Sequence, residues 1–139
     1  MQPRLVTALV VGAVMASSGC APQAPTAEVG DCLQMDSVEG EVTEIPTVDC
    51  TQSHDGQVVM AFDMPGEDYP SEEEWTATLE EKCLEGFEEF VGIAYADSAL
   101  SVRDLSPTEE SWEAGDRQVL CIAFTDAEPA TESFEDAEI

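Results

Sequence analysis

Three adjacent residues, Ser53, His54 and Asp55, have the residue types of a hydrolase triad. A triad needs its histidine between the nucleophile and the carboxylate, whereas consecutive side chains on an extended chain point apart. The G-x-S-x-G turn that exposes a serine nucleophile above a sheet does not accompany them. We therefore interpret this segment as an exposed turn after Cys50, with Asp55 and Gly56 leading the chain into the next strand. His54 is then a candidate binding residue rather than a catalytic one.

The cysteines offer a second kind of chemistry. The chain has five of them, Cys20, Cys32, Cys50, Cys83 and Cys121. The sequence has no C-x-x-C pair for thiol exchange, and it lacks both the close cysteine pairs and the several histidines that zinc sites use. An odd number in an exported protein needs an explanation, and lipidation of one cysteine supplies it.

Lipidation of Cys20 leaves four cysteines, which can pair in three ways. We favour Cys32–Cys50, because the two bracket a stretch with hairpin character, and Cys83–Cys121, because the bond would join a helix to a strand. Each bond would stabilise the fold by about 3 to 4 kcal/mol through the loop that it closes.

Acidic residues dominate the surface chemistry. The chain of 139 residues contains 31 Asp and Glu but only 4 Lys and Arg, a formal net charge of −27. This balance argues against nucleic acid as a partner and against electrostatic binding to anionic lipid. Acids are dense between Glu67 and Glu89, but a calcium site needs several oxygen ligands from a loop of set spacing, and neither Asp55-Gly56 nor the segment from Asp63 to Asp68 has that spacing. We therefore expect no metal site and no cofactor. A solvated helix face is the favoured interpretation, and an acidic surface that binds divalent cations is the alternative.

A polar patch surrounds Trp112. We expect Trp112 to be buried, Gly115 to permit a tight turn, and Asp116 to pair with Arg117 or cap the entry to a strand. Because positive residues are so few, we expect Arg117 to have a carboxylate partner. His54, Trp112, Asp116 and Arg117 are therefore our candidate binding residues, with the acidic helix face as a further candidate surface.

One helix is clearly indicated. Ser71 and Glu74 have the spacing of a capping box, and Gly92 is typical of a helix end. Apolar residues recur between them at helical spacing: Trp75, Leu79, Cys83, Phe87 and Phe90. Cys83 is therefore expected to face the core, where a bond to a strand could form.

Several short strands surround this helix. We predict strands over residues 30–35, 56–64, 98–105 and 117–125, the last with Cys121 at its centre. One main helix and several strands indicate an α+β fold, a small antiparallel sheet covered on one face by an amphipathic helix and held by two disulfides. Residues 126–139 are rich in acids, and we expect them to be a flexible acidic tail.

The N-terminus has the features of an export signal. A hydrophobic stretch, too short to span a membrane comfortably, follows Arg4 and leads through small residues into Cys20. We interpret residues 1–19 as a lipoprotein signal peptide and residues 20–28 as a tether. Acyl chains on Cys20 would anchor the domain to the extracellular face of the cytoplasmic membrane.

An ordered set of short motifs carries a family resemblance. The set consists of Gly30-Asp31-Cys32, Cys50-x-x-x-His54, Tyr69-Pro70, Cys83 and Trp112-x-x-Gly115-Asp116-Arg117-x-x-x-Cys121. Over residues 29–125 this order resembles the actinobacterial septum formation domain family, which places Pro where Ser53 stands here. The resemblance implies paired cysteines, residence in the cell envelope and a link to division, and it brings no catalytic residues.

We therefore expect a non-enzymatic domain, anchored by lipid, that binds an envelope protein or a cell-wall component near the membrane.

Overall fold

The computed structural model describes residues 26–40 and 42–139 of the chain. The predicted signal peptide, Cys20 and most of the predicted tether lie outside the described residues. Within the described residues, no helix is long and apolar enough to cross a membrane.

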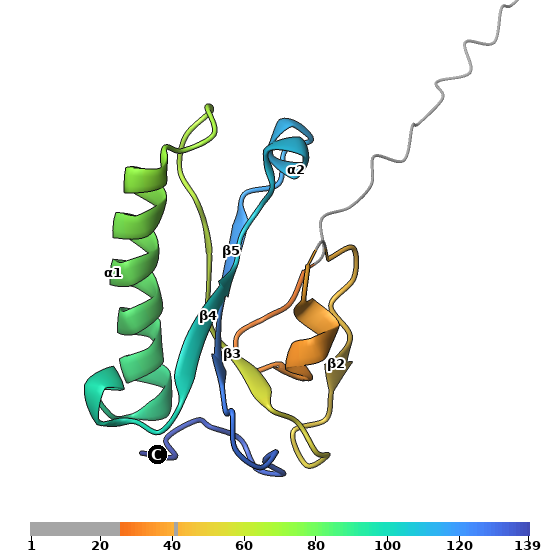
Figure 1. The fold of residues 1–139 in the computed structure, drawn as a ribbon, viewed down its shortest axis with the longest axis vertical. Coiled ribbons are helices and arrows are strands. Elements are labelled where there is room, and N and C mark those ends of the chain that lie inside the picture. Colours follow the sequence, from red (N-terminus) through yellow and green to blue (C-terminus); the bar gives the residue numbers. More distant parts are fainter. Residues whose placement is uncertain (1–25, 41) are drawn as a thin grey trace, which may run out of the picture.

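A twisted antiparallel sheet forms the centre of the fold, with the strand order β2-β1-β3-β5-β4 in the described residues. The strands are β1 (Cys32–Leu33), β2 (Thr47–Val48), β3 (Gly56–Asp63), β4 (Ser101–Leu105) and β5 (Gln118–Phe124). The helices are α1 (Glu72–Val91) and α2 (Glu109–Glu113), with short 3₁₀ turns η1 (Met35–Val38) and η2 (Tyr95–Asp97). Figure 1 shows α1 along one face of the sheet. The predicted α+β class with one main covering helix is confirmed.

Helix α1 begins and ends where the sequence predicts. The Ser71 hydroxyl accepts a hydrogen bond from the Glu74 backbone N–H, and the Glu74 carboxylate accepts one from the Ser71 N–H, so both halves of the capping box are present. Gly92 ends the helix in the left-handed conformation, at φ 83°. At Gly86, a Cβ atom would lie 2.4 Å from the Met60 Cβ, so a glycine is needed for α1 to approach β3 this closely.

The other face of the sheet is covered by the segment that precedes β3, which the sequence did not indicate. Ala27, Val38 and Ile45 pack there as a second apolar cluster against residues of the sheet such as Val58 and Ile122. Figure 1 shows this segment on the side of the sheet opposite to α1. The fold therefore has three layers: α1, the sheet, and the segment that precedes β3. The strands β3 and β5 lie in the middle layer and are covered on both faces.

Two predicted strands are shorter than expected. The strand predicted over residues 30–35 is limited to Cys32–Leu33, because the chain turns into η1 at Met35, whose N–H donates to the Asp55 carboxylate at 2.6 Å. The strand predicted over residues 98–105 begins at Ser101. The strands at residues 56–64 and 117–125 are confirmed to within one residue at their ends.

The prediction of a flexible tail over residues 126–139 is wrong. This segment, which we call the strap, crosses the end of the sheet and runs to the end of α1 (Figure 1). Phe134 is 1% exposed and belongs to the core under α1. The backbone N–H groups of Asp136 and Glu138 donate to the carbonyls of Phe90 and Val91, each at 2.9 Å. The last turn of a helix leaves such carbonyls without partners, so the strap satisfies groups that α1 cannot satisfy itself.

The strap also has a strained backbone. Asp136 and Glu138 both adopt left-handed φ angles, 52° and 53°, without being glycines. Such strain persists only where the surroundings enforce it. The acidic composition of the strap therefore does not prevent it from being held in place, because its backbone and the side chains of Ser133 and Phe134 make the contacts.

Candidate functional site

Both predicted disulfides are present. Cys32 and Cys50 are joined with a Cα–Cα distance of 5.3 Å, and Cys83 and Cys121 are joined at the same distance. The first bond ties the loop after β2 to β1, and the second ties α1 to the centre of β5. Among the three possible pairings, the one that we favoured from the sequence is confirmed.

Ser53, His54 and Asp55 do not form a triad. The Ser53 carbonyl accepts a hydrogen bond from the Gln34 side chain, and the Asp55 carboxylate accepts one from the Met35 N–H. The His54 ring and the Asp55 carboxylate each have a hydrogen-bond partner outside this segment or on its backbone, and the structure gives no hydrogen bond that links the three side chains to one another.

His54 is buried, and the prediction that it lies on an exposed loop is wrong. The side chain is 0% exposed, and its ring lies 5.5 Å from the ring of Phe134. Its Nδ1 is 2.9 Å from the Gln52 carbonyl oxygen, which can only accept, so Nδ1 carries the proton. The backbone of His54 also forms a two-way bridge with Ala130 of the strap. His54 thus holds the strap against the start of β3.

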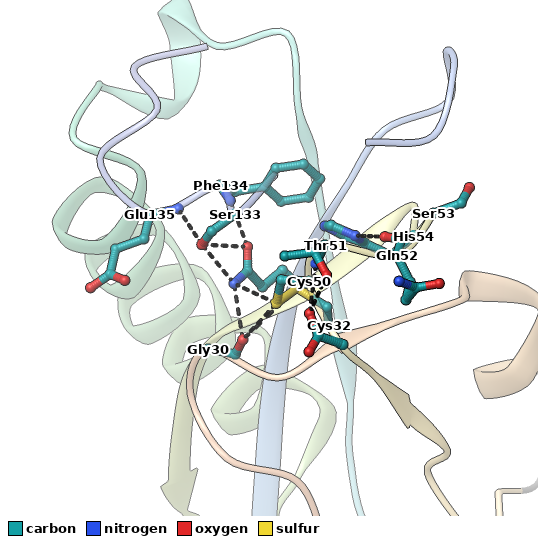
Figure 2. The surroundings of a disulfide bond; sticks show 12 residues. Gly30, Cys32, Cys50, Thr51, Gln52, Ser53, His54, Ser133, Phe134 and Glu135 are labelled. Carbon is teal, nitrogen blue, oxygen red and sulfur yellow. Dashed lines mark hydrogen bonds between the residues drawn. A yellow bond between two sulfur atoms is a disulfide. The ribbon is translucent and has the colours of Figure 1, made fainter. Parts of the chain in front are cut away.

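Gln57 is the second residue that fixes the strap, and no pattern in the sequence indicates this role. Its side chain, 1% exposed, donates to the Gly30 carbonyl at 2.9 Å and to the Ser133 hydroxyl at 3.0 Å. The Phe134 N–H donates to the Gln57 Oε1 at 2.6 Å. Figure 2 shows three of the partners of Gln57, namely Gly30, Ser133 and Phe134, beside the Cys32–Cys50 disulfide. We call Gln57, His54, Ser133 and Phe134 the strap cluster.

The patch around Trp112 lies at the opposite end of the sheet. Trp112 is 3% exposed, as predicted, and its indole N–H donates to the Glu67 carbonyl at 2.9 Å. Its ring makes edge contacts with Tyr69 and Trp75, at centroid distances of 5.6 and 6.2 Å. We call Tyr69, Trp75, Trp112 and Arg117 the arginine cluster.

The prediction that Arg117 has a carboxylate partner is wrong. In the described part of the chain, the guanidinium instead donates to three backbone carbonyls: Gly66 at 3.3 Å, Trp112 at 2.8 Å and Asp116 at 2.7 Å. Its central carbon also lies 3.7 Å from the centre of the Trp112 ring, a cation–π contact. Arg117 therefore ties the loop after β3, the end of α2 and the start of β5 together, which makes it a structural residue.

Asp116 and Gly115 shape the same turn. The Asp116 carboxylate accepts a hydrogen bond from the Gln118 N–H at 3.2 Å, so Asp116 caps the entry to β5, one of the two roles considered for it. Gly115 has φ 102°, which a residue with a Cβ rarely adopts. Tyr69 is the most exposed member of the arginine cluster, at 38%.

The acidic face of α1 is solvated, as expected. Its one lysine, Lys82, lies 3.4 Å from the Glu85 carboxylate and is half-exposed. The Ser71 hydroxyl and N–H lower the pKa of Glu74 through their hydrogen bonds, and those of Thr51 lower the pKa of Asp49 in the same way. Across the described residues, no group of three or more potential ligands is placed to hold a metal ion.

A groove of about 410 Å³, which the sequence did not indicate, lies between the strap, the start of β4 and the end of β5. Leu100 and Phe134 form its buried floor, and Asp126 and Glu128 stand exposed at its edge. Phe134, the one aromatic residue of the strap, is the signal in the sequence that could have indicated this region.

The comparisons with known proteins give one match. The model of a family described as septum formation matches residues 14–121, which is most of the chain. No curated protein and no solved structure matches it. The family is not a known enzyme family.

Proposed function

The chain belongs to the septum formation family, and on that premise we propose that it is a lipid-anchored binding domain of the cell envelope that takes part in septum formation. Family membership supports the septum-related role. The anchor, the location at the extracellular face of the membrane and the absence of catalysis are our proposals.

The two disulfides carry the argument for export. Disulfides form and persist mainly in oxidising compartments outside the cytoplasm. Four of the five cysteines are paired in the described part of the chain. The remaining one is Cys20, which follows the hydrophobic stretch of the predicted signal after three small residues, and this position supports its modification by lipid.

The arrangement of polar groups supports binding rather than catalysis. The residues that most resembled catalytic machinery have structural partners: His54 bonds to Gln52, and Asp55 bonds to Met35. Arg117, which could have held a carboxylate of a substrate, is occupied by backbone carbonyls. We infer that the domain acts through its surface, as a partner of another envelope component.

Localisation in dividing cells tests the proposal. A functional fluorescent fusion of the full chain is compared with the same fusion carrying Cys20→Ala, and lipidation is followed by incorporation of a labelled fatty acid. We expect the wild-type fusion to be lipidated and enriched at the septum. The Cys20→Ala fusion should incorporate no label and lose its septal enrichment.

Two results would contradict the proposal. A wild-type fusion distributed evenly around the cell would remove the septal role, although the anchor could still be read from the label. A Cys20→Ala fusion that keeps both label and position would remove the anchor. Ser18→Ala is the matched control, since it changes a neighbouring residue of the signal and leaves Cys20 intact.

A further inference from the structure

We propose that the groove beside the strap, which we call the strap groove, binds a cationic peptide segment that inserts an apolar side chain. This inference rests on the proposed binding function and names the site and the chemistry of the partner. It is drawn from the shape of the groove, from its charge and from the way in which its walls are held.

The shape of the strap groove fits a side chain. Its walls include Ala99, Ala127 and Ala130, whose small side chains leave the space open above a floor of Leu100 and Phe134. The volume of about 410 Å³ is within the range of pockets that hold small ligands or a few side chains. An apolar side chain placed there would be removed from water, which favours binding.

The charge of the strap groove selects the partner. Asp126 and Glu128 line it and are exposed, and no lysine or arginine is among its lining residues. The whole chain carries a formal charge of −27, so a cationic segment is attracted from a distance as well as at contact. An acyl chain could fill an apolar groove, but the anionic headgroup that usually accompanies it would be repelled by this edge.

The walls of the strap groove are preformed. Phe134 is fixed by the hydrogen bond from its N–H to Gln57, and Ala130 by its two backbone bonds to His54. A site whose walls are ordered before binding avoids the entropic cost of ordering them on binding. Gln57 and His54 therefore hold these walls in place, and neither of the two is among the residues that line the groove.

A fluorescence anisotropy titration tests the proposal. The full chain, purified with both disulfides intact, is titrated against labelled pentapeptides at low salt: Lys-Lys-Leu-Lys-Lys, Lys-Lys-Ser-Lys-Lys and Glu-Glu-Leu-Glu-Glu. We expect the first to bind about tenfold or more tightly than the second, which matches burial of one leucine side chain. The third should not bind measurably.

Two variants assign the binding to the groove. Asp126→Asn with Glu128→Gln should weaken the leucine peptide several-fold, whereas Glu109→Gln with Glu110→Gln, which removes two exposed acids of α2, should leave it nearly unchanged. Ala127→Phe should fill the groove and reduce the leucine peptide to the affinity of the serine peptide. Amide exchange of the Phe134 N–H reports whether each variant keeps the strap in place.

Several outcomes would overturn the proposal. An equal loss of peptide affinity in Asp126→Asn with Glu128→Gln and in the α2 variant would mean that the peptide is held by diffuse charge attraction. An unchanged preference for the leucine peptide in Ala127→Phe would mean that the leucine side chain binds outside the groove. Binding to vesicles of anionic phospholipid that displaces the peptide would assign the groove to lipid. Absence of peptide binding would remove this inference alone, because the septal localisation of the fusion is measured separately.

Discussion

The two ends of the sheet are closed in opposite ways. At the end where β3 leaves the sheet, the Arg117 and Trp112 side chains donate to backbone carbonyls of the surrounding loops and contact each other through a cation–π interaction. At the other end, Gln57 and His54 bind the backbone of the strap, and Phe134 enters the core. One end is organised by an arginine side chain, and the other by the buried residues Gln57, His54 and Phe134.

The two ends differ in how much of their side-chain chemistry remains available to a partner. The motif that stands out in the sequence, from Trp112 to Arg117, makes its hydrogen bonds to the surrounding loops and so has a structural role. The strap, which resembles an unstructured acidic tail, supplies a groove with an open apolar floor. In this protein a distinctive motif therefore reports a demand of folding, and the candidate interaction surface lies where the sequence is least distinctive.

The substitution with the largest expected effect on stability is Phe134→Ala, at the strap end of the sheet. Loss of a buried aromatic side chain usually costs about 3 to 5 kcal/mol of the free energy of unfolding, and Phe134 is 1% exposed. We expect a loss of this size in denaturant unfolding, with a smaller loss for Phe134→Leu. Glu135→Gln, an exposed neighbour, is the control. A loss of less than about 1 kcal/mol for Phe134→Ala would mean that the strap does not close the core.

The second test is Arg117→Lys, which keeps the charge but removes the planar donor group. A lysine cannot donate to three converging carbonyls and stacks less well on an indole, so we expect unfolding to be easier by about 1.5 to 3 kcal/mol. Arg103→Lys, on an exposed position of β4, should change the value by less than about 0.5 kcal/mol. Equal effects of the two substitutions would show that Arg117 contributes only its charge.

The third test is Gln57→Leu at the strap end. It leaves the Phe134 N–H and the Gly30 carbonyl without their partner, which should cost about 1 to 3 kcal/mol. Amide exchange at Phe134 should accelerate more in Gln57→Leu than in Arg117→Lys at matched stability. Equal acceleration would mean that the two ends open together, and the comparison between them would lose its meaning.

Local signals explain what could be predicted from the sequence. The capping box of Ser71 and Glu74 and the left-handed Gly92 bound α1 through residues within one turn of each end. The burial of Trp112 and the turn at Gly115 follow from residue type alone. The disulfide pairing was predicted from the elements expected to carry the cysteines. It is correct because the helix and the strand that carry Cys83 and Cys121 were predicted correctly.

Contacts between distant residues explain what could not be predicted. Phe134 and Gln57 are 77 residues apart, and neither residue type indicates that the other lies beside it. The partners of Arg117 are backbone carbonyls, which every residue has, so no sequence pattern marks the three that converge. Acidic composition suggested a flexible tail at residues 126–139, because composition describes side chains and not the backbone bonds that hold this segment to α1.

The smallest expected effect concerns α1, which runs from the arginine cluster to the strap. The Ser71 hydrogen bonds lower the pKa of Glu74 below its value in the unfolded chain, so the ionised carboxylate stabilises the folded state. This contribution is fully present above the unfolded pKa and is lost as the pH falls through the lower, folded pKa.

Glu74→Gln keeps the capping geometry and removes the charge. We expect the wild-type chain to be slightly more stable than this variant at neutral pH, and the difference to shrink as the pH falls toward about 3. Unfolding in denaturant at several pH values measures it, with Glu89→Gln, on an exposed position near the other end of α1, as the control. The same pH dependence in both variants would assign the effect to the general acidity of the helix. A pH dependence found for Glu74→Gln alone would show that the capping box stabilises the first turn of α1. This stabilisation would be independent of the hydrogen bonds between the strap and the last turn.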